Sequence, residues 1–331
     1  MPANRFWIHP GAALVAGLSL AALPAAQQPW AAPATGPVPL EAAAGGRVFR
    51  EDVQVRFVVL HATVLNRKGK TVLGLGPDDF HVTEDGVPQE ISVFGSSENQ
   101  PAKIAFLLDV SGSMSLRKKL EQARRAIERF VTTLEPNDQM ALLIFADGDV
   151  VIVQGFTADR RLFVKVLEEQ KAYGKTALRD ALAYAPSLLA GNTSGRKALV
   201  VITDGIDNAS RLTSSEIIRM ARQVQVPIYT LGISGLPLRF RRASSGPKGS
   251  STLFDQMREF SRETGGDLWP VFESADFDAV FSSIRGRLAG QYIIGYRPPP
   301  HAGVSGFRRV ELRTSQRSNQ VFTRRGYYVK N

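Results

Sequence analysis

The hydrophobic positions of this chain follow two different patterns along its length. Residues 53–59 alternate between apolar and other side chains, as a strand with one buried face does. Residues 104–108 and 198–202 are unbroken apolar runs, which are typical of strands buried on both faces of a parallel sheet. Residues 116–134 repeat apolar side chains at helical spacing. The pattern therefore predicts a half-buried β region followed by an α/β region.

Strand and helix patterns continue to alternate up to residue 288. We expect further strands at residues 140–145, 150–153, 227–233 and 267–272, and further helices at residues 159–170, 177–189, 214–225, 253–264 and 277–288. Repeated alternation with right-handed crossovers builds a doubly wound, mostly parallel sheet with helices on both faces. The expected fold class is therefore α/β and Rossmann-like.

Two β segments flank the α/β region, at residues 51–97 and 290–331. Asp85 and Gly86 form a hairpin signal in the first segment. In a doubly wound fold the chain enters and leaves on the side opposite the carboxyl ends of the strands, so we expect both segments to pair into one small split β-module there. The expected strands lie at residues 80–84, 87–94, 292–296, 307–313 and 321–329.

Residues 1–34 have the features of a secretory signal peptide. An apolar stretch of small residues and leucine follows Arg5, and cleavage is expected after Ala26 or Ala34. A membrane anchor is the alternative, although the stretch is short for a bilayer. Residues 35–50 are rich in Ala, Pro and Gly and are expected to form a tether. We therefore expect an exported protein, which is periplasmic, cell-surface or secreted, with no transmembrane span after signal cleavage.

Composition narrows the classes of partner. The chain has 41 basic and 31 acidic residues, and its net charge of +10 favours acidic partners, with a solvated basic surface as the alternative. No nucleic-acid-binding motif accompanies the charge, so nucleic acid is not an expected partner. The absence of cysteine excludes disulfides and thiolate metal sites.

Polar side chains follow the first apolar strand at every second position, as Asp109, Ser111 and Ser113. Asp204 follows the strand at residues 198–202, and the carboxyl ends of parallel strands meet at one edge of the sheet. Carboxylate and hydroxyl oxygens are hard ligands suited to Mg²⁺ or Mn²⁺. Two aspartates balance the charge of such an ion, and neutral hydroxyls leave it able to accept a carboxylate from a partner. Alternatively, Asp109 and Ser111 only cap the next helix, which does not explain Asp204.

This pattern resembles the von Willebrand factor type A domain family over about residues 102–288. Besides the Asp-x-Ser-x-Ser run, the resemblance includes Thr176 after Gly-Lys, and Asp204 within Thr-Asp-Gly. It implies that Ser111, Ser113 and Thr176 bind a divalent ion through their hydroxyls, with Asp109 and Asp204 acting directly or through water. It also implies a role in adhesion or protein–protein interaction. The flanking β segments are similar to those of bacterial secreted members of the family.

Two acidic residues near this site have other expected roles. Asp180 is expected to lie on a helix and to hold the neighbouring loop by hydrogen bonding. Asp207 is expected to be a turn residue and not a ligand.

Three enzyme interpretations compete with a binding module. Asp109 could be the nucleophile of a metal-dependent hydrolase or phosphoryl-transfer enzyme, but the second acidic residue that usually follows is missing. The Gly-Lys-Thr run at Thr176 lacks the upstream glycine of a P-loop. Ser111 as a hydrolase nucleophile needs a histidine, and none of the four histidines lies in the α/β region. We therefore expect no enzyme, and a scaffold with a vestigial metal site is the remaining alternative.

A basic segment at residues 234–252 follows the strand at residues 227–233. It contains Arg239, Arg241 and Arg242 and no acidic residue. Since it leaves the carboxyl end of its strand, it is expected on the rim of the metal site, where it would steer an acidic ligand. The alternative is an insertion whose charges are only solvated.

Overall fold

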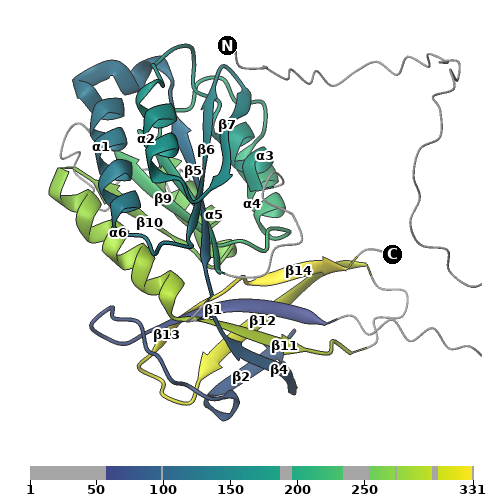
Figure 1. The fold of residues 1–331 in the computed structure, drawn as a ribbon. Helices are drawn as coiled ribbons and strands as arrows, with labels where there is room; N and C mark the ends of the chain where they lie inside the picture. Colours follow the sequence, from purple (N-terminus) through teal and green to yellow (C-terminus); the bar gives the residue numbers. More distant parts are fainter. Residues whose placement is uncertain are drawn as a thin grey trace, which may run out of the picture. The chain divides into compact units, whose positions relative to one another are not determined.

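Two buried strands form the centre of a six-stranded sheet. β5 (Ala102–Asp109) and β8 (Arg196–Thr203) are parallel neighbours in the strand order β10-β9-β8-β5-β6-β7. The other strands are β6 (Gln139–Ala146), β7 (Asp149–Thr157), β9 (Ile228–Ile233) and β10 (Asp267–Val271). Only β7 pairs antiparallel, so the predicted mostly parallel sheet is confirmed (Figure 1).

The computed structural model describes part of the chain at the level of individual residues. The described residues are 57–97, 100–186, 196–233, 253–272, 274–299 and 305–329. The expected signal peptide at residues 1–34, the tether at residues 35–50 and the arginines of the basic segment lie outside them. Among the described residues, no helix is both long enough and apolar enough to cross a bilayer.

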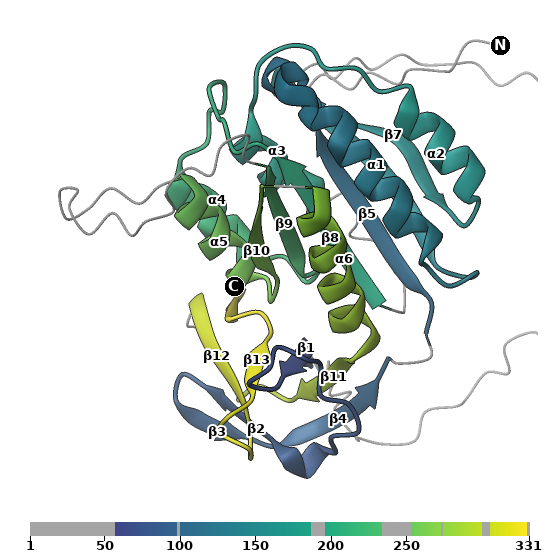
Figure 2. The same cartoon turned by 90° about the vertical axis from the view of Figure 1, so that its left-hand side faces the viewer.

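Helices cover both faces of the sheet, as predicted for a doubly wound fold (Figure 2). One face packs against α1 (Lys119–Thr132), α2 (Arg160–Glu168) and α6 (Ser274–Ala289), and the other against α3 (Leu178–Tyr184), α4 (Ser214–Ala221) and α5 (Leu253–Glu263). Alternate side chains of β5 enter the two cores, with Phe106 in the first and Leu107 in the second. Burial on both faces explains the unbroken apolar run in this strand.

The first helix begins later than the apolar spacing predicted. A 3₁₀ segment, η2 (Gly112–Lys118), precedes α1. Arg117 and Lys118 have φ angles of 54° and 56°, so their backbone is left-handed and interrupts the helix. The expected helix start at residue 116 was therefore wrong, because the helical spacing of apolar side chains does not record the backbone angles of the polar residues between them.

The flanking β segments form two four-stranded sheets. Their strand orders are β13-β1-β11-β4 and β14-β12-β2-β3. The strands are β1 (Val58–Leu65), β2 (Phe80–Glu84), β3 (Val87–Gln89), β4 (Ile91–Ser96), β11 (Gln291–Tyr296), β12 (Gly306–Thr314), β13 (Gln320–Phe322) and β14 (Gly326–Val329). The predicted pairing between the two segments is confirmed, since β1 pairs with β11 and β2 with β12.

The split β-module that we expected consists of a pair of sheets around one core. The expected strand at residues 87–94 divides at Glu90 into β3 and β4, which belong to different sheets. The expected strand at residues 321–329 divides in the same way into β13 and β14. The predicted hairpin turn is present, because Asp85 and Gly86 have φ angles of 49° and 84°, as a type I′ turn requires.

One arginine joins the α/β domain to the β sheets. The guanidinium of Arg287, near the end of α6, lies 4.9 Å from the ring centre of Trp269 and 4.1 Å from that of Phe322. Its Nη2 is 3.3 Å from Oδ2 of Asp267, and its carbonyl accepts a hydrogen bond from the hydroxyl of Thr63. Asp267 begins β10, so this junction lies at the amino edge of the parallel sheet, opposite Asp109.

Candidate functional site

Asp109 is the last residue of β5 and is fully buried. Its Oδ1 accepts a hydrogen bond of 2.9 Å from the amide of Ser111, and its Oδ2 accepts one of 2.6 Å from the hydroxyl of Thr203. Burial raises the pKa of Asp109 to about 6, and the nearby charge of Asp204 acts in the same direction while the hydrogen bonds oppose it. A cation close to this carboxylate would stabilise its ionised form.

The two serines of the motif lie next to each other at the start of η2. Their Oγ atoms are 3.1 Å apart, with Ser111 buried and Ser113 half-buried. Between them, the amide of Gly112 donates a 2.9 Å hydrogen bond to the carbonyl of Gly174. The Asp109 loop is thus tied to the loop that precedes Thr176.

Gly174 adopts a conformation that favours glycine. Its φ is 70°, and a Cβ at this position would come within 2.1 Å of Oδ2 of Asp147. The Asp147 carboxylate also accepts a hydrogen bond of 2.6 Å from the amide of Lys175. Asp147 follows β6, so residues that follow two strands, β5 and β6, support this loop.

Thr176 is buried and is bonded to the loop that follows Asp204. Its amide donates to Oδ1 of Asn208 at 3.0 Å, and its carbonyl accepts from the amides of Asn208 and Ala209. The chain therefore brings Thr176 close to the Asp204 loop by main-chain contacts, although the two residues lie on separate loops.

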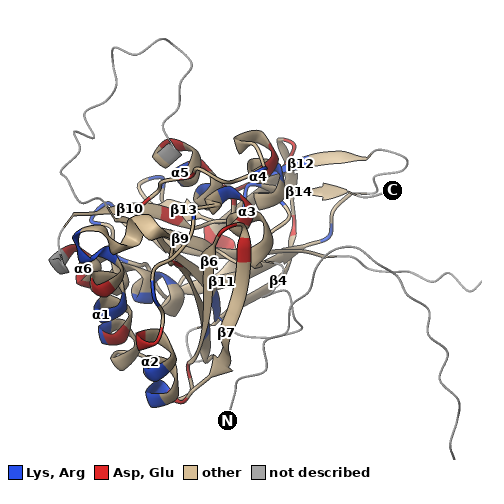
Figure 3. Cartoon of the chain, turned by 90° about the horizontal axis from the view of Figure 1, so that it is seen from above, with Lys and Arg blue, Asp and Glu red and all other residues tan. Residues whose placement is uncertain are grey.

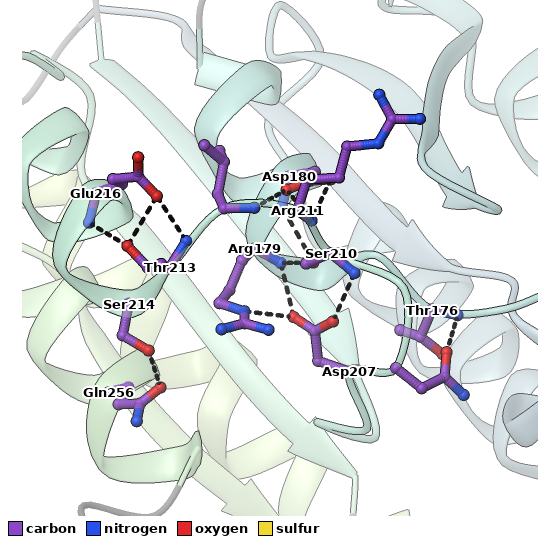
Figure 4. A network of polar contacts seen from close by, with 12 residues as sticks. Thr176, Arg179, Asp180, Asp207, Ser210, Arg211, Thr213, Ser214, Glu216 and Gln256 are labelled. Carbon is purple, nitrogen blue, oxygen red and sulfur yellow. Dashed lines mark hydrogen bonds and ion pairs between the residues drawn. The ribbon is translucent and has the colours of Figure 1, made fainter.

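Two acidic side chains, Asp180 and Asp207, join the start of α3 to the loop that follows Asp204 (Figure 4). Asp180, on α3, accepts hydrogen bonds from the amides of Arg211 and Leu212 at 3.0 to 3.1 Å. Asp207 accepts from the amide and Nε of Arg179. These contacts confirm the expectation that Asp180 holds the neighbouring loop by hydrogen bonding. That Asp207 is a turn residue and not a ligand stays a prediction.

Asp204 lies at the end of β8 and is almost completely buried. Its Oδ1 accepts a 3.2 Å hydrogen bond from the amide of Ile206. Its Oδ2 is 2.7 Å from Nζ of Lys119, the first residue of α1. A lysine ammonium thus contacts one of the two carboxylates that the sequence assigned to a metal ion.

The donor set fits a hard divalent ion. Hydroxyl and carboxylate oxygens belong to loops at one edge of the sheet that are joined by hydrogen bonds, and such oxygens are the ligands that Mg²⁺ and Mn²⁺ accept. Among the described residues, no group of three or more histidine, aspartate or glutamate side chains could hold a metal. The candidate site has only two carboxylates, so hydroxyls would have to complete it.

Sequence reasoning missed Thr203, Lys119 and Asn208. Thr203 is the first residue of the Thr-Asp-Gly run, so its position beside Asp204 was a usable signal. Asn208 and Lys119 gave no local signal, because their contacts depend on how separate loops meet.

The basic and acidic residues of α1 lie side by side (Figure 3), so this helix does not present a surface of one sign.

Known proteins resemble the α/β part of the chain. Residues 104–206 match the family model of the von Willebrand factor type A domain. An uncharacterised protein of Borreliella burgdorferi is 30% identical over an alignment of 191 residues, and the alignment covers 53% of this chain and 55% of that protein. Inter-alpha-trypsin inhibitor heavy chain H3 of Homo sapiens is 24% identical over 213 residues, which are 59% of this chain and 22% of that protein.

The chain thus spans about half of the first relative and a smaller part of the second. Among solved structures, a von Willebrand factor type A protein from Catenulispora acidiphila aligns with a TM-score of 0.47 and 15% identity. That alignment covers 82% of this chain and 74% of the other. The family match begins in β5 and ends just after Asp204, so it contains all five predicted ligands but not Asn208. Over residues 104–206, this chain therefore matches the von Willebrand factor type A domain family.

Proposed function

We propose that this protein is an exported binding module that captures an acidic partner through a divalent ion. The ion is Mg²⁺ or Mn²⁺, and its ligands are Asp109, Ser111, Ser113, Thr176 and Asp204. A carboxylate of the partner completes the coordination of the ion. Proteins with this type of domain commonly act in adhesion and protein–protein interaction, which agrees with the proposal.

One observation carries the proposal. The fully buried carboxylate of Asp109 is held by two hydrogen bonds beside a pair of serine hydroxyls, and the described ion pairs include Asp204 but not Asp109. Burial disfavours the ionised form of a carboxylate, and a nearby positive charge offsets that cost. A divalent ion at the hydroxyls would supply that charge.

The ligand set explains why the ion would bind a partner. Magnesium prefers six oxygen ligands and keeps several waters when the protein supplies few charged groups. Neutral hydroxyls from Ser111, Ser113 and Thr176 do not reduce the positive charge of the ion. A carboxylate from another molecule therefore gains a strong interaction by replacing a water.

The enzyme alternatives find little support among the described residues. His61 and His81 lie on β1 and β2, in the β sheets, so neither stands beside Ser111 as a general base would. A phosphoryl-transfer site would need the second acidic residue that usually follows the nucleophile in the sequence, or a phosphate-binding loop near Asp109. The loop at Thr176 is instead fixed by main-chain bonds to Asn208 and Ala209.

Calorimetry with Mg²⁺ tests the metal site. The protein should bind one Mg²⁺ per chain, and Asp109→Ala should abolish binding while the circular dichroism spectrum stays unchanged. Asp149→Ala is the matched control, because Asp149 is exposed at the start of β7. This control should bind Mg²⁺ as the parent protein does.

A peptide array tests the partner chemistry. Each glutamate-containing peptide is paired with its glutamine counterpart and probed with the protein in Mg²⁺ or in chelator. We expect binding that requires both glutamate and Mg²⁺ and that is lost in Asp109→Ala. Binding that persists in chelator would support the vestigial-site alternative and contradict the proposal.

Export and ligand steering complete the proposal. Cleavage after Ala26 or Ala34 would be visible as the mass of the mature protein recovered from outside the cytoplasm.

Replacing Arg239, Arg241 and Arg242 by serine should slow association with an acidic peptide at low salt, since fixed charges raise association rates most at low ionic strength. An unchanged salt dependence would contradict the steering role.

A further inference from the structure

The ion pair between Lys119 and Asp204 lies inside the candidate metal site. Nζ of Lys119 is 2.7 Å from Oδ2 of Asp204, with side-chain exposures of 11% and 1%. Exposed ion pairs contribute little, whereas a buried pair is a strong constraint, because loss of one partner leaves the other charged and desolvated. This contact therefore places a positive charge directly against the carboxylate of Asp204.

The position of Lys119 is unusual for a lysine. It is the first residue of α1, where the helix dipole disfavours a positive charge. The left-handed residues Arg117 and Lys118 precede it and set the direction in which the helix begins. Helix formation alone does not account for a buried ammonium here, whereas the carboxylate of Asp204 does.

The two carboxylates of the site differ in their partners. Both oxygens of Asp109 accept hydrogen bonds from neutral groups, the amide of Ser111 and the hydroxyl of Thr203. Asp204 accepts one bond from a neutral amide and one from the ammonium of Lys119. Of the two negative charges, only that of Asp204 is compensated by a described residue.

We propose that Lys119 is the built-in counter-ion of Asp204 and that a divalent ion has to compete with its ammonium for this carboxylate. The inference rests on the proposed metal site. Two consequences follow from the charges. The ion binds less tightly than two free aspartates would allow, and once bound it is less neutralised, so it attracts the carboxylate of a partner more strongly.

Lys119→Met tests the competition, with Lys118→Met as the matched control. Lys118 is the preceding residue and is exposed, so the control removes the same charge at almost the same place in the sequence. With chelator present, Lys119→Met should unfold at a lower temperature than the parent protein, because Asp204 loses its counter-ion. Calorimetry should show Mg²⁺ binding about tenfold tighter in Lys119→Met, since a competing charge in a buried site has been removed.

Lys118→Met should change neither the unfolding temperature nor the Mg²⁺ affinity by a comparable amount. If Lys119→Met does not fold in chelator, Lys119→Gln keeps a hydrogen-bond donor for Asp204 without the charge and should also bind Mg²⁺ more tightly. Mg²⁺ binding that is unchanged or weaker in the folded Lys119 variant overturns the competition. Absence of Mg²⁺ binding in both the parent protein and the variant overturns the proposed metal site itself.

Discussion

The hydroxyl of Thr203 donates a 2.6 Å hydrogen bond to Oδ2 of Asp109 and so joins the carboxyl ends of β8 and β5. The two residues are 94 positions apart in the sequence. Both are fully buried, so water cannot replace the bond if it is lost. The orientation of the Asp109 carboxylate therefore depends on a residue that is not itself a candidate ligand.

Thr203→Val should weaken both the fold and the metal site. The substitution keeps the shape of the side chain but leaves a buried carboxylate oxygen without its donor, which costs about 1–3 kcal/mol of unfolding free energy. Loss of a bond that orients a metal ligand should also lower Mg²⁺ affinity by about tenfold or more. Chemical denaturation and calorimetry measure the two effects.

Thr230→Val is the control for this prediction. Thr230 is equally buried in the neighbouring strand β9, and its hydroxyl is 2.9 Å from that of Ser261. This variant should lose stability as well but should keep its Mg²⁺ affinity. A similar loss of Mg²⁺ affinity in both variants would show that general destabilisation, and not the Asp109 bond, is responsible.

Asp180→Ala should loosen the Asp204 loop. The Asp180 carboxylate accepts the amides of Arg211 and Leu212, so its removal leaves both main-chain donors without this partner. We expect a loss of about 1 kcal/mol of unfolding free energy, as for the removal of a helix cap. Hydrogen exchange should become faster at Arg211 and Leu212, and Mg²⁺ affinity should fall.

A second aspartate provides the comparison. Asp159 caps α2 by accepting the amides of Arg161 and Leu162. It follows the antiparallel strand β7, so it lies at the sheet edge opposite Asp109. Asp159→Ala should cost a similar stability and leave Mg²⁺ affinity unchanged, and any equal effect on Mg²⁺ would argue against a specific role of Asp180.

The order of strands and helices in the α/β domain could be predicted because burial on two faces leaves a simple pattern. β5 and β8 appear in the sequence as uninterrupted apolar runs. The division of the β segments into two sheets could not be predicted in the same way. Alternation across residues 87–94 shows that one face is buried, but it does not show that the chain changes sheets at Glu90.

The candidate site shows the same limit. Asp109 and Asp204 could be assigned to one sheet edge, because each directly follows a recognisable strand. The position of Lys119 could not be assigned, because it depends on the left-handed backbone of Arg117 and Lys118. Those two residues are polar and have side chains that carry no preference for this conformation, so the sequence gives no signal for it.

The acid sensitivity of the fold should depend on His61. This residue lies on β1, and its pKa is lowered from 6.5 to about 4 by burial, with further contributions from the positive charges of Arg324 and Lys197. Above pH 6.5 the histidine is neutral in both the folded and the unfolded chain. Between pH 6.5 and 4 the unfolded chain binds a proton at this residue that the folded chain does not, so the contribution of His61 to stability falls as the pH falls.

For this residue alone, the unfolding free energy falls by about 1.4 kcal/mol for each pH unit between pH 6.5 and 4, and the change levels off below pH 4. Urea denaturation at several pH values measures it. His61→Gln should flatten the profile between pH 6.5 and 4, whereas His81→Gln, at an exposed position on β2, should not. Parallel profiles for the parent protein and His61→Gln would contradict the assignment.

The strand order of the β sheets shows that the first β segment, residues 51–97, pairs most of its strands with strands of the last segment, residues 290–331. Both neighbours of β1, which are β11 and β13, come from residues 290–331. Among the strands of the described residues, β4 pairs with β11 alone. Within residues 50–97, the pairing of β2 with β3 is the only one between named strands. A single hairpin is marginally stable in water.

A fragment of residues 50–97 should therefore be unfolded on its own. Its circular dichroism spectrum should lack strand signal and it should be digested rapidly by protease, because β1 and β4 have lost every strand that pairs with them. Joining residues 290–331 to the fragment through a Gly-Ser linker should restore strand signal and resistance to protease, since β11 and β12 then supply the missing partners. A stable, protease-resistant fragment without residues 290–331 would mean that the interleaved pairing is not needed for this part of the chain to fold.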